Sequence, residues 1–279
     1  MSGGVDSSVA ATILKNQGFD ITGVFVKGWY PEGGVCGWKE ERRDAMRVAA
    51  KLGISFLTYD FSKEYEKEII VYMKREYSGN RTPNPDVMCN KYIKFGLFLK
   101  ESLRRGADYI ATGHYVRNLE TRFPLGNPVS KLFQAVDKNK DQSYFLWTLT
   151  QEQLKYCFFP IGDYKKPDVR KMADKFGLST AGKKDSQGLC FVGELDFALF
   201  LRKIIPKKEG EIRTSDGKVI GKHDGSHFYT IGQRHGLGVS GKAPYYVVGK
   251  DLKNNVLIVA EKKDEKKFYK KEVIIDSAN

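Results

Sequence analysis

The strongest constraint on the fold is a regular alternation of short apolar segments and amphipathic segments along the first two-thirds of the chain. Strands are predicted at 21–26, 54–59 and 109–112, and helices at 40–52, 61–77 and 92–105. The strand segments are rich in β-branched residues, as expected for buried strands of a parallel sheet. Repeated βα units of this kind predict an α/β fold with a doubly wound, mostly parallel sheet.

The pattern changes near Glu209. From there, short strands predicted at 211–213, 218–220, 244–249 and 255–259 are separated by Asp-Gly and glycine-rich turns. We therefore expect a small β-rich domain, with the boundary at the segment 206–208. The first domain is predicted to span 1–206 and the second 207–268.

The net charge is +13, from 47 Lys+Arg against 34 Asp+Glu. A basic excess of this size favours a polyanionic partner, because phosphates release counterions when lysine and arginine neutralise them. The charge is spread along the chain, which fits a folded surface that binds nucleic acid; a generic basic protein is the alternative. No apolar run is long enough to span a bilayer and no secretory signal opens the chain, so we expect a cytoplasmic protein without a membrane partner.

The chain has four cysteines, Cys36, Cys89, Cys157 and Cys190. They form no C-x-x-C pair, and the four histidines show no metal-ligand spacing, so no metal site is predicted. Structural disulfides are also not expected in a cytosolic chain. The cysteines are then either reactive thiols or small buried residues.

The segment Ser-Gly-Gly-Val-Asp-Ser-Ser at 2–8 runs directly into an apolar helix. Two glycines allow successive N–H groups to point at one anion, and the helix N-terminus adds positive potential. A Walker A loop has lysine directly before its final serine or threonine, and Asp6 occupies that place here. The segment therefore predicts a cradle for pyrophosphate rather than for a transferring γ-phosphate; a simple Gly-Ser turn is the alternative.

Two further segments contain cysteines in polar surroundings. In 81–91, helix is predicted to begin just after Cys89, so this thiol beside Lys91 should have a lowered pKa, and Asp86 could act as general acid or base. The alternative is a buried structural cysteine. The segment 184–193 contains Cys190, and two reactive thiols suit persulfide chemistry, in which one carries sulfur and the other releases it. His114 follows a strand, where doubly wound sheets bind ligands; a structural histidine is the alternative.

The loop at 2–8 resembles that of the PP-loop ATP pyrophosphatases. Within that family, three segments closely resemble the tRNA-specific 2-thiouridylases (MnmA-type): Asn-Pro-Asp-x-x-Cys-Asn at 84–90, Asp-Ser-Gln-Gly-x-Cys-Phe at 185–191, and Thr-Ile-Gly-Gln-Arg at 230–234. The resemblance implies ATP-dependent 2-thiolation of a wobble uridine, with adenylation of the uracil 2-oxygen and Mg²⁺ as the metal that accompanies ATP. The partners it implies are tRNA of the Lys, Glu and Gln type and a persulfide donor protein.

The resemblance also implies roles for individual residues. Cys190 would carry the persulfide sulfur, Cys89 would release it with formation of a disulfide bond, and Asp86 would be the acid or base. Residues implied to bind ATP are Met1, Ser2, Gly3, Gly4, Val5, Asp6, Ser7, Val26 and Gly113. Residues implied to bind tRNA are Asn84, Pro85, Asp86, His114, Lys140, Asp141 and Gln142. Cys36 and Cys157 match no catalytic role.

The chain departs from this family at both ends. Family members have an apolar strand before the Ser-Gly-Gly and a third, β-barrel domain, of which 269–279 would be the start. We therefore expect a chain truncated at both ends that folds poorly, because neighbouring strands lose ladder hydrogen bonds. Two other functions stay open: a PP-loop synthetase acting on a small acid or amide, and a tRNA-binding module without catalysis.

Overall fold

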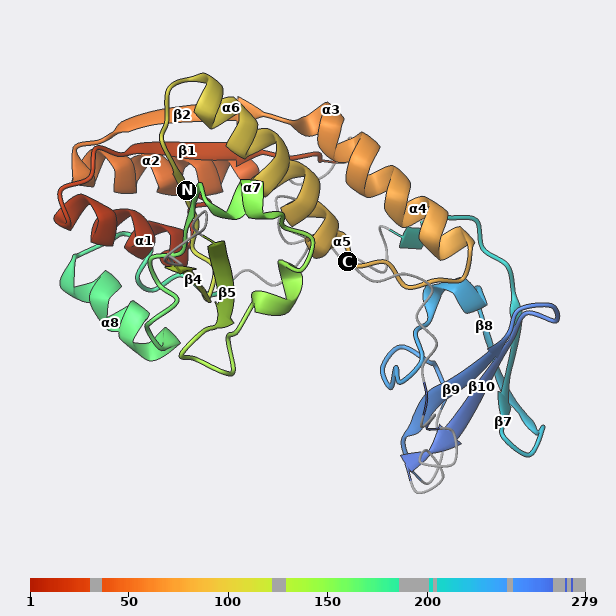
Figure 1. The fold of residues 1–279 in the computed structure, drawn as a ribbon. Helices are drawn as coiled ribbons and strands as arrows, with labels where there is room; N and C mark the ends of the chain where they lie inside the picture. Colours follow the sequence, from red (N-terminus) through yellow and green to blue (C-terminus); the bar gives the residue numbers. More distant parts are fainter. Residues whose placement is uncertain are drawn as a thin grey trace. The chain divides into compact units, whose positions relative to one another are not determined.

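A computed structural model of the chain describes residues 1–30, 37–121, 129–185, 201–202, 205–239, 243–262, 269 and 272. The chain divides into two compact units, of which the first comprises Met1–Ile70 and Pro85–Leu195 and the second Val71–Asn84 and Asp196–Asn279 (Figure 1). The segment 71–84 thus belongs to the same unit as the C-terminal strands, although it lies inside the N-terminal part of the sequence.

The first unit opens with a helix and two parallel strands. Its elements are α1 (Val5–Asn16), β1 (Thr22–Lys27), α2 (Trp38–Leu52) and β2 (Ser55–Asp60). β1 pairs with β2 in parallel, and α2 packs against both strands through its buried face (Figure 1). Gly53 ends α2 in the left-handed conformation, at φ 62°, which glycine adopts without strain. The predicted strands and helix are confirmed, with boundaries shifted by one or two residues.

Two long helical runs follow, and each contains a π-helical stretch. The first comprises α3 (Ser62–Tyr65), η1 (Glu66–Ile70) and α4 (Val71–Ser78); the second comprises α5 (Pro85–Met88), η2 (Cys89–Phe98) and α6 (Leu99–Arg104). The prediction that helix begins just after Cys89 is wrong, because the second run begins at Pro85. Proline suits the first helical turn, where its fixed φ is helical and its missing N–H has no intrahelical partner to lose.

The rest of the first unit consists of short strand pairs and helices. β3 (Ile110–Ala111) pairs in parallel with β6 (Cys157–Phe158), and β4 (Val116–Thr121) forms an antiparallel hairpin with β5 (Val129–Gln134). This hairpin was not expected from the sequence. The remaining elements are η3 (Ser143–Phe145), α7 (Gln151–Leu154) and α8 (Lys166–Lys175). Among the described residues, the parallel pairs β1–β2 and β3–β6 are not hydrogen-bonded to one another.

The packing of α1 against α8 forms the core beneath the N-terminal loop. Val5 and Val9 of α1 and Val169 of α8 are buried in one apolar cluster. This contact brings the first turn of α8 close to the first turn of α1, which is where the glycine-rich loop ends. The core therefore holds the N-terminal ends of α1 and α8 close to each other.

The second unit contains a mixed sheet with strand order β8-β7-β10-β9. Its strands are β7 (Gly210–Thr214), β8 (Val219–His223), β9 (Tyr245–Asp251) and β10 (Val256–Glu261), and a short helix, η4 (Ser226–Phe228), follows β8. β7 and β10 run in parallel, and the other neighbours are antiparallel. Ile212, Leu257 and Val259 form the centre of its core. The β-rich character predicted for this part of the chain is confirmed.

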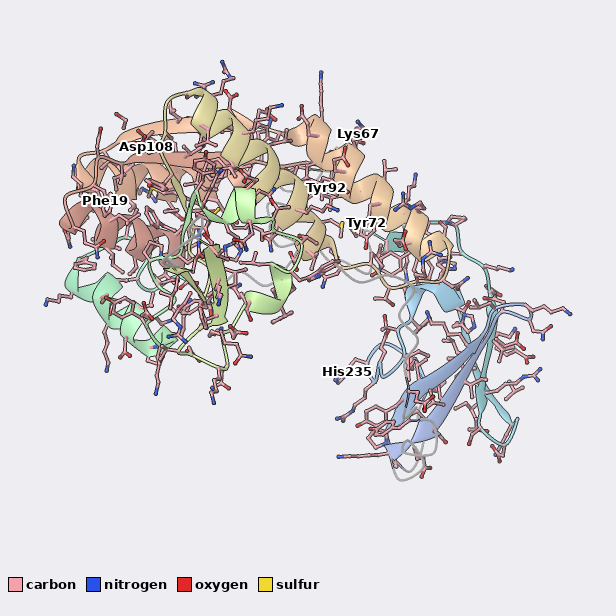
Figure 2. All side chains as sticks on the ribbon, viewed as in Figure 1. Phe19, Lys67, Tyr72, Tyr92, Asp108 and His235 are labelled. Atoms are coloured by element: carbon pink, nitrogen blue, oxygen red, sulfur yellow. The ribbon has the colours of Figure 1, made fainter. Side chains whose placement is uncertain are left out.

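Charged side chains project from the elements of both units (Figure 2). Lys67 in the first unit and Arg213 in the second have exposed fractions of 81% and 45%, so each unit exposes basic side chains. No helix within the described ranges is both long enough and apolar enough to cross a membrane.

Candidate nucleotide and thiol site

The N-terminal loop has the geometry that the sequence predicts for an anion cradle. Gly3 adopts φ +75°, and a Cβ atom there would lie 2.3 Å from the carbonyl oxygen of Glu41, so only glycine fits. The Ser2 backbone N–H donates to Ser7 Oγ over 3.1 Å, and the Ser8 hydroxyl donates to the Gly4 carbonyl over 2.7 Å. These bonds close the loop tightly over the start of α1.

The same loop fits the phosphates of a nucleotide. Gly4 is the N-cap residue of α1 and has extended backbone angles, and no side chain caps this helix. The N-terminus of a twelve-residue helix therefore presents its backbone N–H groups and positive end without a competing carboxylate cap. The backbone nitrogen of Met1 donates to Val24 of β1, which places the start of the loop beside the strand that contains the buried Val26.

The segment 112–115, at the C-terminal end of β3, packs directly against the loop. A Cβ atom on Gly113 would lie 2.7 Å from the backbone nitrogen of Ser7, which again leaves room only for glycine. The Tyr115 hydroxyl donates to Asp6 Oδ1 over 2.8 Å. The structure therefore brings together two predicted nucleotide-binding elements, the loop 1–7 and Gly113, that are far apart in the sequence.

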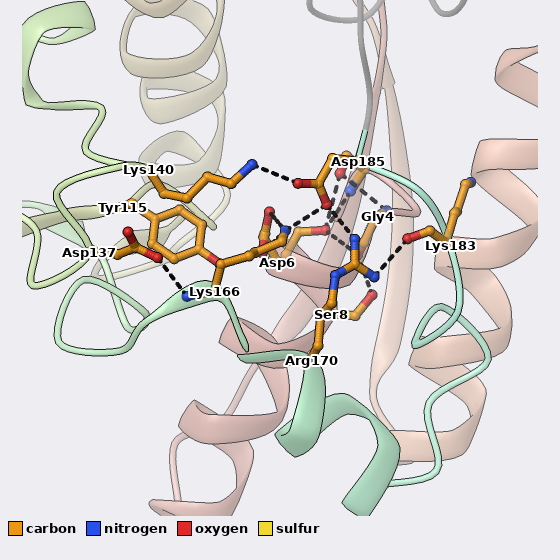
Figure 3. A network of polar contacts seen from close by, with 12 residues as sticks. Gly4, Asp6, Ser8, Tyr115, Asp137, Lys140, Lys166, Arg170, Lys183 and Asp185 are labelled. Atoms are coloured by element: carbon orange, nitrogen blue, oxygen red, sulfur yellow. Dashed lines mark hydrogen bonds and ion pairs between the residues drawn. The ribbon is translucent and has the colours of Figure 1, made fainter. Parts of the chain in front are cut away.

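A network of charged side chains lies at Asp6 (Figure 3). Lys166 Nζ lies 2.8 Å from both carboxylate oxygens of Asp6 and 2.9 Å from Asp185 Oδ1. Asp185 also accepts from Lys140 over 2.8 Å and from Arg170 over 2.6 Å. Partial burial would raise the pKa of Asp185, but the bonds from Lys140 and Lys166 outweigh this effect and lower the pKa to about 2. Asp185 is therefore a carboxylate throughout the physiological range.

Tyr115, Lys166 and Arg170 were not predicted from the sequence to be site residues. Each is a single residue of a common type, in a segment without a recognisable motif. Asp185 was noted only as the start of the segment that contains Cys190. The spacing of Lys166 and Arg170 by one helical turn on α8 was the available signal, but it does not reveal which residues they face.

Cys89 lies inside the helical run that starts at Pro85. It is the first residue of η2 and is fully buried, whereas Asp86 lies in the preceding turn and is half-buried. A Cβ atom on Gly96 would lie 2.8 Å from the Lys91 carbonyl oxygen, so this wide helical turn needs glycine. The helix begins one turn before Cys89, so this thiol does not lie at a helix N-terminus as predicted.

His114 connects the strand end to the helix that contains Cys89. Its Nδ1 lies 2.8 Å from Thr112 Oγ1, its Nε2 lies 3.5 Å from Lys94 Nζ, and its ring packs on Phe95 of η2. Burial, and then the nearby Lys94, lower the pKa of His114 well below its usual value. His114 is therefore a buried neutral imidazole in this structure. The segment 112–115 thus contacts both the phosphate loop and the thiol helix.

The segment Lys140-Asp141-Gln142 holds its own loop in place. Asp141 accepts from the Ala135 backbone N–H over 2.8 Å, and the Gln142 side chain accepts from the Tyr115 backbone N–H over 3.0 Å. Lys140 instead extends to Asp185. Among the other residues predicted to bind tRNA, Asn84 is exposed and Pro85 is half-buried.

The remaining cysteines differ in what can be described. Cys190 and Cys36 lie outside the described residues. The pairing of Cys89 with Cys190 therefore stays a prediction. Cys157 is buried, its thiol donates to the Gln153 carbonyl over 3.1 Å, and burial raises its pKa to about 12. Within the described ranges, no group of three or more His, Cys, Asp or Glu side chains is placed to hold a metal ion.

The fold and the site define a nucleotide-binding α/β protein with a glycine-rich phosphate loop, followed by a β-rich unit. Family models described as the tRNA methyl transferase HUP domain and the tRNA methyl transferase PRC-barrel domain match residues 1–194 and 198–261.

Curated relatives give a narrower assignment. A protein of Listeria monocytogenes is 53% identical over 94% of this chain and 70% of its own length, and one of Lysinibacillus sphaericus is 50% identical over 96% of this chain and 72% of its own length. Both are named tRNA-specific 2-thiouridylase MnmA, and a similar protein of Geobacillus kaustophilus, 51% identical over 96% of this chain and 72% of its own length, is named tRNA-specific 2-thiouridylase MnmA 2. The chain belongs to the tRNA-specific 2-thiouridylase family.

Proposed function

We propose that this protein uses ATP to replace the 2-oxygen of a wobble uridine in tRNA with sulfur. The observation that carries the proposal is the contact of the segment 112–115 with both the phosphate loop and the helix of Cys89. Gly113 and Tyr115 meet the loop, while His114 meets η2. The phosphate loop and the helix of Cys89 therefore both pack against the C-terminal end of β3. A reaction that activates a base with ATP and then adds sulfur requires its nucleotide site and its thiol to be close in this way. The names of the relatives at about 50% identity agree with this reaction.

The loop would hold ATP through residues 1–7, with Val26 and Gly113 on the adenine side. In the activation step the uracil 2-oxygen attacks the α-phosphorus, the bond to the bridging oxygen breaks, and pyrophosphate leaves. Mg²⁺ usually binds through phosphate oxygens and one or two carboxylates, and it would neutralise charge on the leaving pyrophosphate. Asp6 and Asp185 are the carboxylates that lie at the loop.

Sulfur would arrive as a persulfide on Cys190, formed by a separate donor protein. The terminal sulfur attacks C2 of the activated base and AMP leaves with the former 2-oxygen. The Cys89 thiolate then attacks Cys190 Sγ, which breaks the sulfur–sulfur bond to the base and forms a disulfide. The product is 2-thiouridine, and a cellular thiol must reduce the disulfide before the next cycle.

tRNA of the Lys, Glu or Gln type would bind through the basic surface, with the wobble base turned out of the anticodon loop so that the enzyme can reach C2. Asp86 would act as acid or base, and Asn84, Pro85, His114 and the segment 140–142 would contact the RNA. Because His114 is buried, its contribution requires either a local rearrangement or an action through Lys94. The reaction is proposed to occur in the cytoplasm, with catalysis by 1–206 and support from the domain at 207–268 and the segment from 269.

The test is to incubate the chain with ATP, Mg²⁺, a persulfide donor and unmodified tRNA, and to search the digested RNA for 2-thiouridine by mass spectrometry. We expect product from the wild type and from Cys157→Ser, and none from Cys89→Ser or Cys190→Ser. Cys157→Ser is the matched control because Cys157 is also buried but matches no catalytic role.

Other results would contradict the proposal. Full product from Cys89→Ser would overturn its thiol role. Cleavage of ATP to AMP and pyrophosphate without any thiolation would indicate a PP-loop synthetase with a different substrate. Binding of tRNA without binding of ATP would indicate a tRNA-binding module without catalysis.

A further inference from the structure

The short helix η3 presents an exposed tyrosine on the first unit. Tyr144, its middle residue, is 61% exposed, and Trp147, three positions later, is 56% exposed. Leu146 lies between them in the sequence and is fully buried in an apolar cluster of the same unit. The backbone is therefore packed against the core at a place where two large aromatic side chains reach solvent.

η3 is attached both to the segment that follows β3 and to the helix that contains Cys89. The Gln142 backbone N–H donates to the Tyr115 carbonyl over 2.9 Å, and the Tyr115 backbone N–H donates to the Gln142 side chain over 3.0 Å. The Asn90 side chain donates to the Phe145 carbonyl over 3.2 Å. Asn90 directly follows Cys89 and is only 2% exposed, so it holds η3 from the interior of the unit. The turn with the exposed tyrosine thus contacts both elements that the proposed function requires.

The ring of Tyr144 is supported by the ring of the next residue. The centres of the Tyr144 and Phe145 rings lie 4.1 Å apart, with an angle of 36° between their planes. This contact covers one side of the tyrosine, and its high exposure leaves aromatic surface for a flat ligand. A ring that is already held in place loses little conformational freedom when it binds. These are the properties of a stacking surface.

An unpaired nucleobase is the flat ligand that fits this position. Proteins that bind single-stranded RNA stack its bases on aromatic side chains, while basic side chains contact the phosphates. The net charge of the chain is +13, and Lys91, next to Asn90 on the thiol helix, is exposed. When the wobble base turns out of the anticodon loop, the base beside it loses a stacking partner. An exposed aromatic ring close to the thiol helix can replace that partner.

We propose that Tyr144 stacks on a base next to the wobble uridine in the anticodon loop of tRNA, and replaces the stacking that this base loses when the uridine turns out. The inference rests on the proposed function, because it assumes that tRNA is the substrate. Tyr144 contacts the RNA away from the reacting atoms, so it contributes to RNA affinity rather than to the chemistry at C2.

The test uses the whole 279-residue chain and an RNA hairpin with a lysine-type anticodon loop, in which 2-aminopurine replaces a base beside the wobble uridine. Stacking on an aromatic ring quenches 2-aminopurine fluorescence. Tyr144→Ala should weaken hairpin binding about 5- to 100-fold, the usual effect of losing one base–aromatic stack, and its complex should be brighter than that of the wild type. Because the side chain is mostly exposed, we expect this variant to fold, which thermal melting checks.

Two further variants separate stacking from other effects. Tyr144→Phe keeps the ring and should bind the hairpin like the wild type. Tyr109→Ala is the matched control and should also bind normally, because Tyr109 is 50% exposed and packs on a phenylalanine ring but precedes β3 instead of following it. The loss in Tyr144→Ala should be equal at low and high salt, because stacking releases no counterions, whereas loss of a phosphate contact would reduce the salt dependence.

Wild-type hairpin affinity in Tyr144→Ala, or equally weak binding by Tyr144→Ala and Tyr144→Phe, would overturn the inference. Unchanged RNA affinity with slower sulfur delivery from the donor protein would also overturn it, and would assign this tyrosine to a protein contact. In each of these cases, thiolation of tRNA by the wild type would leave the proposed function intact. A wild-type chain that neither binds nor thiolates tRNA would overturn both.

Discussion

The hydroxyl group of Tyr115 donates a 2.8 Å hydrogen bond to the Asp6 carboxylate, and so attaches the end of β3 to the phosphate loop. Both groups belong to the same compact unit but are 109 positions apart in the chain. The bond therefore exists only in the folded protein. It also leaves Asp6 between two partners, Tyr115 and Lys166, that hold it in a single orientation.

We expect Tyr115→Phe to lower the free energy of unfolding by about 1–2 kcal/mol, because the hydrogen bond is to a charged group but is only partly buried. The change removes only the hydroxyl and keeps the ring that packs in the core. Urea unfolding followed by circular dichroism measures the effect. Tyr109→Phe is the control, since Tyr109 is 50% exposed, and it should change stability by less than about 0.5 kcal/mol. Equal stability of the two variants would contradict this prediction.

Gly113→Ala should abolish ATP binding or weaken it more than about tenfold. A Cβ atom at this position would lie 2.7 Å from Ser7 N and 2.8 Å from the carbonyl carbon of Asp6, so the loop backbone must move. Gly182→Ala is the control, because its Cβ would meet no atom within 4 Å. Titration of a fluorescent ATP analogue measures both variants. Wild-type affinity in Gly113→Ala would show that the loop tolerates displacement.

Asp185→Asn should lower the free energy of unfolding by about 1–2 kcal/mol at pH 7, after allowance for solvent screening of a group that is partly exposed. The folded pKa of about 2 lies below the ordinary value of 3.8, so this stabilisation is present above pH 4 and disappears as the pH falls towards 2. The wild type and the variant should therefore converge in acid. Asp168→Asn is the control, because Asp168 is 53% exposed and lies 3.9 Å from its partner Lys171.

Protonation of His114 should be coupled to unfolding. Its folded pKa is lowered well below 6.5, mainly by burial, so below pH 6.5 the unfolded chain binds a proton that the folded chain does not. The free energy of unfolding then falls with decreasing pH, by at most about 1.4 kcal/mol per pH unit for this one group.

His114→Asn should show a smaller loss of stability between pH 7.5 and 5.5 than the wild type, measured by urea unfolding at each pH. His235→Asn should keep the wild-type profile, because His235 is exposed on the second unit (Figure 2). An unchanged pH profile in His114→Asn would show that His114 does not cause the acid sensitivity.

Local sequence patterns were sufficient where the structure depends on neighbouring residues. The strands β1 and β2, the helix between them and the four strands of the second unit all lie close to their predicted positions. The phosphate loop is also encoded locally, because glycines at 3 and 4 directly precede the helix that presents its N-terminus to the loop. The family resemblance rests on short segments of the same kind.

The start of the helix that contains Cys89 depends on tertiary packing. Two prolines at 83 and 85 were interpreted as a stiff loop, but Pro85 fits equally well in the first turn of a helix, and the following residues continue as helix through Cys89. Whether a proline precedes or begins a helix depends on what the helix packs against. Here Val87, Cys89 and Ile93 are buried, and their packing stabilises the earlier start.

The sequence by itself determined the α/β class, the β-rich unit, the phosphate loop and the identity of the candidate thiols, because each is encoded in a contiguous segment with its own periodicity or motif. Only the tertiary structure decided that Lys166, Tyr115 and Asp185 meet at Asp6, and that His114 and Cys89 are buried. These relationships follow from the packing of α8 on α1 and of η2 beside the end of β3. Long-range packing brings together charges that no spacing in the chain can reveal, and burial and ion pairing together then set which of them stay ionised.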